Sequence, residues 1–210
     1  MISTVIVEDN LYMKNHLENL IKNDGRFELV SSFRDAFEAE KLCAGGAVDL
    51  VLMDVQTLHN HSGLAAGERI KKNSPQTKIV VVTSLIDPEV LSVARRGAAD
   101  SLWYKDHGDE DLYDVIIRTM SGERVFPELS PSVEIKEMFS ADISPRQMEI
   151  LRYFVKGLTY DEIASKLGIT KNGVRWNLEQ IVEKGGFENK HELLAAVIEN
   201  KLIVTTLKDE

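Results

Sequence analysis

Hydrophobic positions in the first 120 residues follow two alternating patterns. Five short runs rich in β-branched or bulky residues have the character of strands: Thr4–Val7, Phe27–Ser32, Leu50–Met53, Ile79–Val82 and Leu102–Trp103. Longer segments with apolar residues at helical spacing follow them and predict helices: Leu11–Asn23, Ala36–Ala44, Leu64–Lys72, Pro88–Arg96 and Leu112–Met120. Two of the strands are apolar without alternation, as expected when helices cover both faces of a parallel sheet. Residues 1–120 are therefore predicted to form an α/β doubly wound domain of five βα units with a parallel sheet.

The pattern changes after residue 120. Residues 121–142 contain prolines and several serines around one short amphipathic piece, Val133–Phe139, and we interpret them as a linker. Residues 143–206 show no strand pattern, and their apolar spacing predicts four short helices: Arg146–Lys156, Tyr160–Leu167, Lys171–Lys184 and Lys190–Asn200. Residues that favour helix N-termini precede each helix: Ser144-Pro145, Thr159, Thr170 and Asn189. A second, all-α domain of four helices is predicted here.

Composition narrows the class of protein. The 43% hydrophobic and 28% charged fractions are those of an ordinary globular protein, and no apolar run is long enough for a spanning helix. The single cysteine, Cys43, cannot form an internal disulfide, so we expect a cytoplasmic protein with Cys43 as a small core residue. The net charge of −9 argues against indiscriminate nucleic-acid or membrane binding, but residues 140–210 hold 10 basic and 11 acidic side chains. The negative charge lies mostly in the first domain.

Polar residues follow four of the five predicted strands. Glu8 and Asp9 come after the first strand, Asp54 after the third, Thr83 and Ser84 after the fourth, and Lys105 after the fifth. Because the carboxyl ends of parallel strands meet at one edge of a doubly wound sheet, these side chains are expected to converge. Clustered carboxylates favour a hard cation such as Mg²⁺, and an aspartate beside one can accept a phosphoryl group. A single acidic residue at a strand end is most simply a helix cap or a solvated loop, but this order of residues favours a phosphorylation site.

These residues resemble the receiver domain of two-component response regulators. The resemblance implies that Asp54 accepts phosphate from a sensor histidine kinase. It implies that Mg²⁺ is bound by Asp9, Asp54 and the backbone carbonyl of Gln56, with Glu8 acting through a water. Thr83 is then the switch hydroxyl and Lys105 the phosphate-binding lysine, and the pair Lys105-Asp106 is similar to the NarL/FixJ branch.

The sequence departs from the receiver pattern in two places. The loop after Asp54 contains His59 and His61, has no proline, and reaches a glycine only at Gly63, so we expect a longer, softer, solvated loop. Two histidines at this spacing are a weak signal for a metal site. The position of the usual switch aromatic is Leu102, which is followed by Trp103 and Tyr104. A switch that depends on burying an aromatic ring at residue 102 cannot operate unchanged.

The second and third helices of the C-terminal domain have the spacing of a helix-turn-helix. Seven apolar residues lie at core-facing positions: Ile163, Ala164, Leu167, Ile169, Val174, Leu178 and Ile181. The remaining positions of the recognition helix point outward or lie at its margins: Lys171, Asn172, Arg175, Trp176, Glu179 and Gln180. Arg175 could bind a guanine edge, Asn172 or Gln180 could bind adenine, and Lys171 and Lys184 could bind phosphates. The alternative from this pattern alone is a protein-binding adaptor whose polar helix face is merely solvated.

Residues 143–203 resemble the LuxR-type DNA-binding domain, through Ile143–Leu151, Lys156–Ala164 and Phe187–Leu193. The family's usual Thr-Val-Lys-x-His in the recognition helix is here Gly173-Val174-Arg175-Trp176-Asn177, and an often basic position is Glu179. Asn177 is accordingly included among the expected DNA-binding residues. The near-zero charge of residues 140–210 predicts weak DNA binding by one copy, so a homodimer and an altered or relaxed DNA sequence are expected.

Together the two resemblances imply a bacterial two-component response regulator. Phosphorylation of Asp54 by a sensor histidine kinase is expected to control dimerisation and sequence-specific DNA binding, and so to regulate transcription. The expected partners are DNA and the kinase, and RNA polymerase is a further candidate. No binding to a membrane is expected. The protein is expected to be a regulator and not an enzyme. Two alternatives stay open: a phosphorylation-independent DNA-binding regulator whose receiver only dimerises, and a protein-binding signalling adaptor.

Overall fold

A five-stranded sheet organises the first part of the chain. The computed structural model describes residues 1–46, 48–106 and 111–204. All five strands are parallel, in the order β2-β1-β3-β4-β5: β1 Ile2–Val7, β2 Phe27–Phe33, β3 Leu50–Met53, β4 Lys78–Thr83 and β5 Ser101–Tyr104. The register of β1 and β2 shifts around Val30, whose side chain is exposed. The predicted doubly wound parallel sheet is confirmed.

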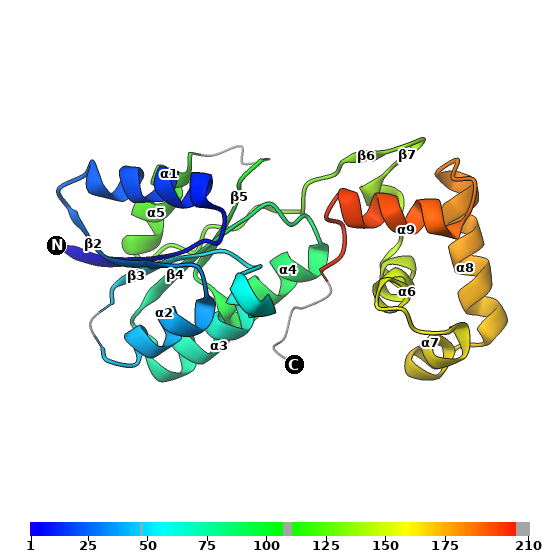
Figure 1. Cartoon of the computed structure of the whole chain (residues 1–210), viewed down its shortest axis with the longest axis horizontal. Coiled ribbons are helices and arrows are strands. Elements are labelled where there is room, and N and C mark those ends of the chain that lie inside the picture. The colour runs from blue at the N-terminus through cyan, green and yellow to red at the C-terminus, as the bar shows by residue number, and fades with distance from the viewer. Residues whose placement is uncertain (47, 107–110, 205–210) are drawn as a thin grey trace. The chain divides into compact units, whose positions relative to one another are not determined.

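Helices cover both faces of this sheet. On one face lie α1 (Leu11–Lys22) and α5 (Leu112–Met120), and on the other lie α2 (Ala36–Cys43), α3 (Gly63–Asn73) and α4 (Pro88–Val93), as Figure 1 shows. Alternate residues of the central strands enter the two cores, so that Ile6, Leu52 and Val80 pack with α1 and α5. This double coverage explains why β1 and β3 are apolar without alternation. Cys43 is buried, as expected.

The segment after β4 differs from the single predicted helix Pro88–Arg96. The α-helical part ends at Val93, and a π-helical turn, η2 Ala94–Ala98, continues from it. Gly97 in this turn has φ +140°, a backbone conformation that is rare for other residues. The turn lies so close to α3 that a Cβ atom on Gly67 would be 2.3 Å from the Ala98 carbonyl oxygen. We attribute the wider turn to this tertiary contact, which a local apolar pattern does not encode.

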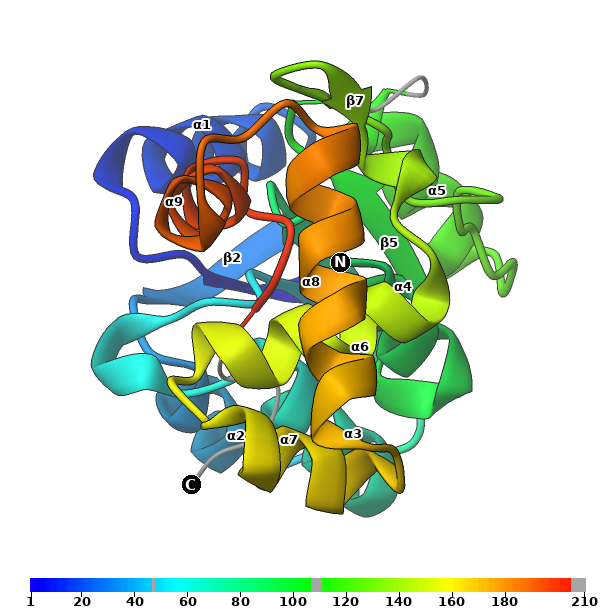
Figure 2. The same cartoon turned by 90° about the vertical axis from the view of Figure 1, so that its right-hand side faces the viewer.

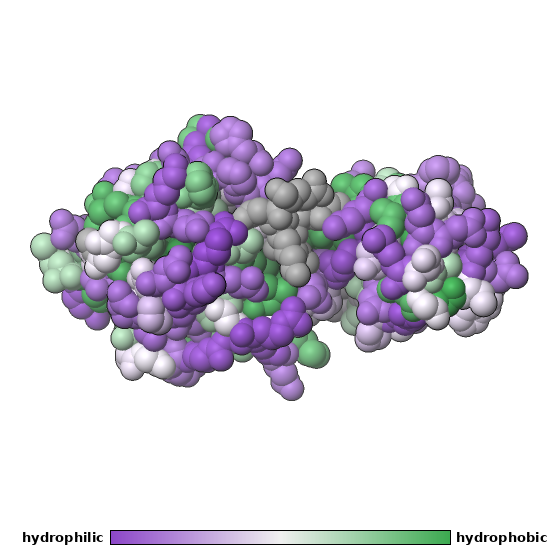
Figure 3. Space-filling view, turned by 90° about the horizontal axis from the view of Figure 1, so that it is seen from below, coloured by the Kyte–Doolittle hydropathy of each residue, from purple (hydrophilic) through white to green (hydrophobic). Residues whose placement is uncertain are grey.

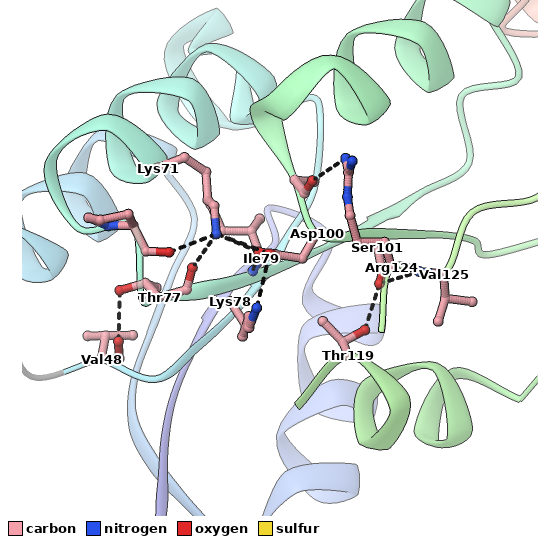
Figure 4. A network of polar contacts seen from close by, with 12 residues as sticks. Val48, Lys71, Thr77, Lys78, Ile79, Asp100, Ser101, Thr119, Arg124 and Val125 are labelled. Carbon is pink, nitrogen blue, oxygen red and sulfur yellow. Dashed lines mark hydrogen bonds and ion pairs between the residues drawn. The ribbon is translucent and has the colours of Figure 1, made fainter. Parts of the chain in front are cut away.

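The amino edge of the sheet contains a polar cluster of its own, shown in Figure 4. The Asp100 carboxylate accepts hydrogen bonds from Lys71 Nζ at 2.8 Å, from Lys78 Nζ at 3.4 Å and from the backbone amide of Ile79 at 2.9 Å. Lys71 Nζ donates further to the carbonyl oxygen of Thr77 at 3.0 Å. One carboxylate thus meets two ammonium groups, and the cluster joins α3 to the starts of β4 and β5.

The second compact unit is mainly helical and comprises, among the described residues, 85–87 and 131–204. Its helices are α6 Pro145–Val155, α7 Tyr160–Leu167, α8 Lys171–Lys184 and α9 Lys190–Glu199, and η3 Ser140–Asp142 precedes them. The fully buried Asp87 carboxylate accepts two hydrogen bonds from Arg152, at 2.6 and 2.9 Å, and one from the Val204 amide. The predicted four-helix arrangement is confirmed, although the last residues of the expected domain, 205–206, lie outside the described residues.

The interpreted linker contains more structure than its composition suggested. The amphipathic piece Val133–Phe139 forms a small antiparallel hairpin, with β6 Glu134–Ile135 paired to β7 Met138–Phe139. Ile135 and Met138 are buried in the core of the helical unit, and this burial explains the amphipathic pattern.

Among the described residues, none of the helices combines the length and apolar character needed to cross a bilayer. The surface in Figure 3 is largely hydrophilic, with hydrophobic residues in separate patches.

Candidate phosphorylation site and helix-turn-helix

The carboxyl edge of the sheet brings together side chains from the ends of three strands. Glu8 follows β1 and is fully buried, Asp54 follows β3 and is 8% exposed, and Lys105 follows β5. Lys105 Nζ lies 2.6 Å from Glu8 Oε2 and 2.9 Å from Asp54 Oδ2. These residues are separated by up to 97 positions in the sequence. Parallel strands place them at one edge because the chain returns through a helix before each new strand.

The cluster carries more negative than positive charge. Carboxylate oxygens of Glu8, Asp9 and Asp54 all lie within 4.8 Å of one another, and Lys105 is the cation in contact with two of them. Burial raises the pKa of Asp54 to about 7, with Lys105 opposing this rise and the Glu8 charge adding to it. Burial alone would lower the pKa of Lys105, but the Asp54 and Glu8 carboxylates raise it above its ordinary value. Three oxygen donors beside one ammonium group form a site suited to a hard cation.

The other predicted residues of this edge lie at or just beyond the same strand ends. Thr83 ends β4 and is fully buried, and its carbonyl oxygen accepts a hydrogen bond from the Lys105 amide at 2.8 Å. Gln56 is exposed two residues after Asp54, and its backbone pairs with that of Ser62. Leu102 is buried within β5, Trp103 is half-buried, and the buried Tyr104 places its hydroxyl 3.1 Å from Ser130 Oγ. A buried aromatic ring is therefore present in β5, two residues after Leu102.

The loop between Asp54 and α3 is tied to the turn before α2. Asp35, the N-cap residue of α2, places its carboxylate 3.1 Å from His59 Nδ1 and 2.7 Å from His61 Nδ1. Thr57 Oγ1 accepts a hydrogen bond from the Ala36 amide and donates one to the His61 carbonyl oxygen. His59 and Asn60 are exposed, as expected for a solvated loop, and these contacts hold the loop against the turn before α2. Asp35 is their partner, and within the described residues the candidate metal-binding group is the carboxylate cluster of Glu8, Asp9 and Asp54.

Gly63 is required by close approach of two backbones. A Cβ atom at this position would lie 1.8 Å from the carbonyl oxygen of Asp54, and the Gly63 amide donates to the Val55 carbonyl at 2.9 Å. The first turn of α3 is thereby fixed directly against the backbone of the candidate phosphorylated residue. In the sequence, Gly63 stands out only by its unusual distance from Asp54, and no local signal indicates this contact.

The helix-turn-helix of the second unit is built from local signals that the sequence carries. Thr159 and Glu162 form a capping box at the start of α7, and Thr170 accepts from the Gly173 amide at the start of α8. Gly168 between them has φ +64°, the left-handed conformation that ends α7. Five of the seven residues predicted to face the core are buried, and the other two pack against it half-buried: Ile163, Ala164, Val174, Leu178 and Ile181, then Leu167 and Ile169.

The outer side of α8 holds the predicted DNA-binding residues. Figure 2 shows this helix facing the viewer, with no other helix of the unit in front of it. Six of the eight predicted side chains are exposed and two are half-buried: Lys171, Asn172, Arg175, Trp176, Glu179 and Lys184, then Asn177 and Gln180. Asn177 Nδ2 donates to the Gly173 carbonyl oxygen at 2.8 Å, so its side chain is bound to its own helix. Trp176 is 59% exposed.

Comparison with known proteins agrees with both halves of this description. The sequence model described as "Response regulator receiver domain" matches residues 4–117, more than half of the chain. The chain therefore belongs to the response regulators. A second model, "Bacterial regulatory proteins, luxR family", matches residues 141–197. This response regulator thus combines a receiver with a LuxR-type domain, the class of DNA-binding transcription regulator predicted from its sequence.

Relatives of this response regulator share the two-domain length. "Oxygen regulatory protein NreC" of Staphylococcus aureus strain JH9 is 26% identical over 213 residues, covering 95% of this chain and 98% of that protein. Solved structures of RcsB share the fold. One is titled as a two-component response regulator RcsB–DNA complex, with a TM-score of 0.62, 20% identity, and coverage of 94% of this chain and 98% of that one. RcsB from Salmonella enterica serovar Typhimurium, bound to promoter rprA with the phosphomimetic BeF3−, gives a TM-score of 0.60, 22% identity and the same coverage.

Proposed function

We propose that Asp54 of this response regulator is phosphorylated by the phosphohistidine of a sensor histidine kinase. The observation that carries this proposal is the position of the Asp54 carboxylate, 2.9 Å from Lys105 Nζ and within 4.8 Å of carboxylate oxygens of Glu8 and Asp9. In the transfer, one Asp54 oxygen attacks phosphorus, the phosphorus–nitrogen bond breaks, and the histidine keeps the electron pair and takes up a proton. In this proposal the Lys105 ammonium and the Thr83 hydroxyl donate hydrogen bonds to phosphoryl oxygens.

The donor set of this edge fits Mg²⁺. In this proposal Asp9, Asp54 and the backbone carbonyl of Gln56 supply oxygen ligands, and Glu8, whose carboxylate contacts Lys105, acts through a water. Mg²⁺ when bound would neutralise the carboxylates and the phosphoryl oxygens that approach them. The chain itself does the rest: β1 and β3 hold the carboxylates in place, and Gly63 fixes the Asp54 backbone. Lys105 moves no proton in this scheme and serves as a fixed positive charge.

Intact-mass measurement after treatment with a small phosphodonor and Mg²⁺ tests the receiver half. The parent should gain the mass of one phosphoryl group, and Asp54→Asn should gain none. Asp114→Asn is the matched control, because Asp114 is an exposed aspartate in the first turn of α5 and is not one of the clustered carboxylates, and it should gain the same mass as the parent. No added mass on the parent would contradict the proposal and favour a regulator whose receiver acts without phosphorylation.

We propose that α8 enters the major groove of DNA and that two copies act together. The support is the helix-turn-helix geometry, the uncovered outer side of α8, and residues there that match base edges and phosphates: Lys171, Asn172, Arg175, Trp176, Glu179, Gln180 and Lys184. Asn177 is a weaker member because its side chain is bound to the helix.

Phosphorylation would change the population of a dimer-competent state and so regulate transcription, by direct or indirect contact with RNA polymerase. We infer that the protein works in the cytoplasm, where its kinase partner and DNA meet.

Binding to genomic DNA fragments at low and high salt tests the helical half. Arg175→Ala should weaken binding roughly tenfold and relax the preference among fragments, because a contact between the helix and a base edge is lost. Lys156→Ala, which removes the same charge from an exposed site at the end of α6, is the control and should bind like the parent. If Arg175→Ala binds as tightly as this control, the assignment of α8 to the groove is wrong, and a protein-binding role becomes the better reading.

A further inference from the structure

The cationic side chains of α8 are all engaged with carboxylates. Lys171 Nζ lies 2.6 Å from Asp161, Arg175 Nε lies 2.8 Å from Glu179 Oε1, and Lys184 Nζ lies 3.3 Å from Asp142. The helix that is proposed to approach a polyanion therefore presents positive charges that are already partly neutralised. Since DNA affinity grows with the number of phosphates that a protein neutralises, this arrangement weakens binding to DNA of arbitrary sequence.

Among these three carboxylates, Glu179 is the one that contacts two cations. Its Oε1 atom accepts from Arg175 on the preceding turn and lies 3.6 Å from Lys190 Nζ at the start of α9. One carboxylate thus holds two cations from two helices at the outer side of the domain. The hydrogen bond from Arg175 lowers the pKa of Glu179 and raises that of Arg175, so both groups are charged at neutral pH.

Helix stability does not account for this pair. Exposed ion pairs contribute little, and in a helix the order with glutamate N-terminal to the cation is the better one. Here Arg175 precedes Glu179, which is the less favourable order. A role of the two side chains in binding a ligand explains the pair better than helix stability does.

We propose that Glu179 is a specificity-determining residue that positions Arg175 for a G·C base pair and suppresses binding to other sequences. This inference rests on the proposed entry of α8 into the major groove. A guanine edge offers two acceptors to the Arg175 fork, and a cytosine amino group can donate to the Glu179 carboxylate. At a matching site, Arg175 and Glu179 give up their mutual hydrogen bond, and each forms hydrogen bonds with a base instead. Where no amino group lies within reach of Glu179, its carboxylate meets acceptors and phosphates, which repel it.

The test compares two variants of the full-length protein with the parent, all treated with phosphodonor and Mg²⁺. Glu179→Gln keeps the shape of the side chain and removes its charge. Glu199→Gln removes the same charge from an exposed position at the end of α9 and is the matched control. Affinity is measured on a duplex selected from a random library by the parent and on a random-sequence duplex of equal length, over a range of salt concentrations.

Glu179→Gln should bind the random duplex roughly tenfold more tightly, and the preference for the selected duplex should fall by a similar factor. The slope of log affinity against log salt should steepen by about one, because Arg175 becomes available to a phosphate. In an Arg175→Ala background the same change should have a clearly smaller effect, which identifies action through Arg175.

The outcomes separate this inference from the proposed function. If the parent and Glu199→Gln bind DNA and Glu179→Gln matches them in preference and salt slope, Glu179 has no role in specificity and the inference is overturned. An unchanged effect in the Arg175→Ala background would overturn the positioning role. If the parent binds neither duplex at low salt, the proposed DNA-binding function fails as well.

Discussion

The clusters at the two edges of the receiver sheet both contain carboxylates and lysines, but lysines outnumber carboxylates in one cluster and carboxylates outnumber lysines in the other. At the amino edge, the Asp100 carboxylate is contacted by two lysines and a backbone amide (Figure 4). At the carboxyl edge, three carboxylates lie together and one lysine contacts two of them. The first cluster surrounds its carboxylate with cationic and amide donors and joins α3 to β4 and β5, so its role is structural. The second keeps excess negative charge in a buried position, a cost that a bound cation would offset. An excess of buried carboxylates, and not the presence of charged residues, marks the candidate functional edge.

The largest expected effect of a substitution is at the amino edge. Asp100→Ala removes the acceptor of Lys71, Lys78 and the Ile79 amide, and it should lower the free energy of unfolding by about 2 to 3 kcal/mol. Denaturant titration measures this loss, with the exposed Asp114→Ala as the control that changes it little. The surviving folded protein should still accept phosphate at Asp54. Loss of phosphorylation without loss of stability would show that the two edges are not separate in function.

A smaller effect is expected where α3 approaches Asp54. Gly63→Ala places a methyl group against the Asp54 carbonyl oxygen, so either the loop or the helix must move, at a cost of about 2 kcal/mol. Gly25→Ala is the matched control, because no atom lies within 4 Å of its added Cβ. We expect Gly63→Ala also to slow phosphorylation in the intact-mass assay. Equal stability and equal phosphorylation of the two variants would contradict the described close approach.

The smallest effect has the opposite sign. Without Mg²⁺, Asp54→Asn should raise the free energy of unfolding by about 1 kcal/mol, because it removes one of three crowded carboxylates. Mg²⁺ should stabilise the parent, by about 1.4 kcal/mol at ten times its dissociation constant, and should stabilise Asp54→Asn much less. Thermal unfolding with and without Mg²⁺ measures both quantities. A destabilised Asp54→Asn, or an equal Mg²⁺ response in both proteins, would mean that excess negative charge does not destabilise the carboxyl edge.

Much of the architecture follows from local features of the sequence. Continuous apolar runs specify the buried strands β1 and β3, and the capping box of Thr159 and Glu162 specifies the start of α7, because these signals act between near neighbours. The convergence of Glu8, Asp54 and Lys105 was also predictable, because parallel topology sends the ends of all strands to one edge.

Contacts between residues distant in the sequence were decided by the tertiary structure. Asp35 meets His59 and His61, Gly63 meets the Asp54 backbone, and Lys190 joins Arg175 at Glu179. Nothing in the sequence near Lys190 indicated this partner, which depends on how α9 packs beside α8. Local propensity and periodicity fix which segments form and which of their faces are apolar. The distances between polar side chains are set only when those faces are buried together, and it is these distances that separate a structural cluster from a candidate functional site.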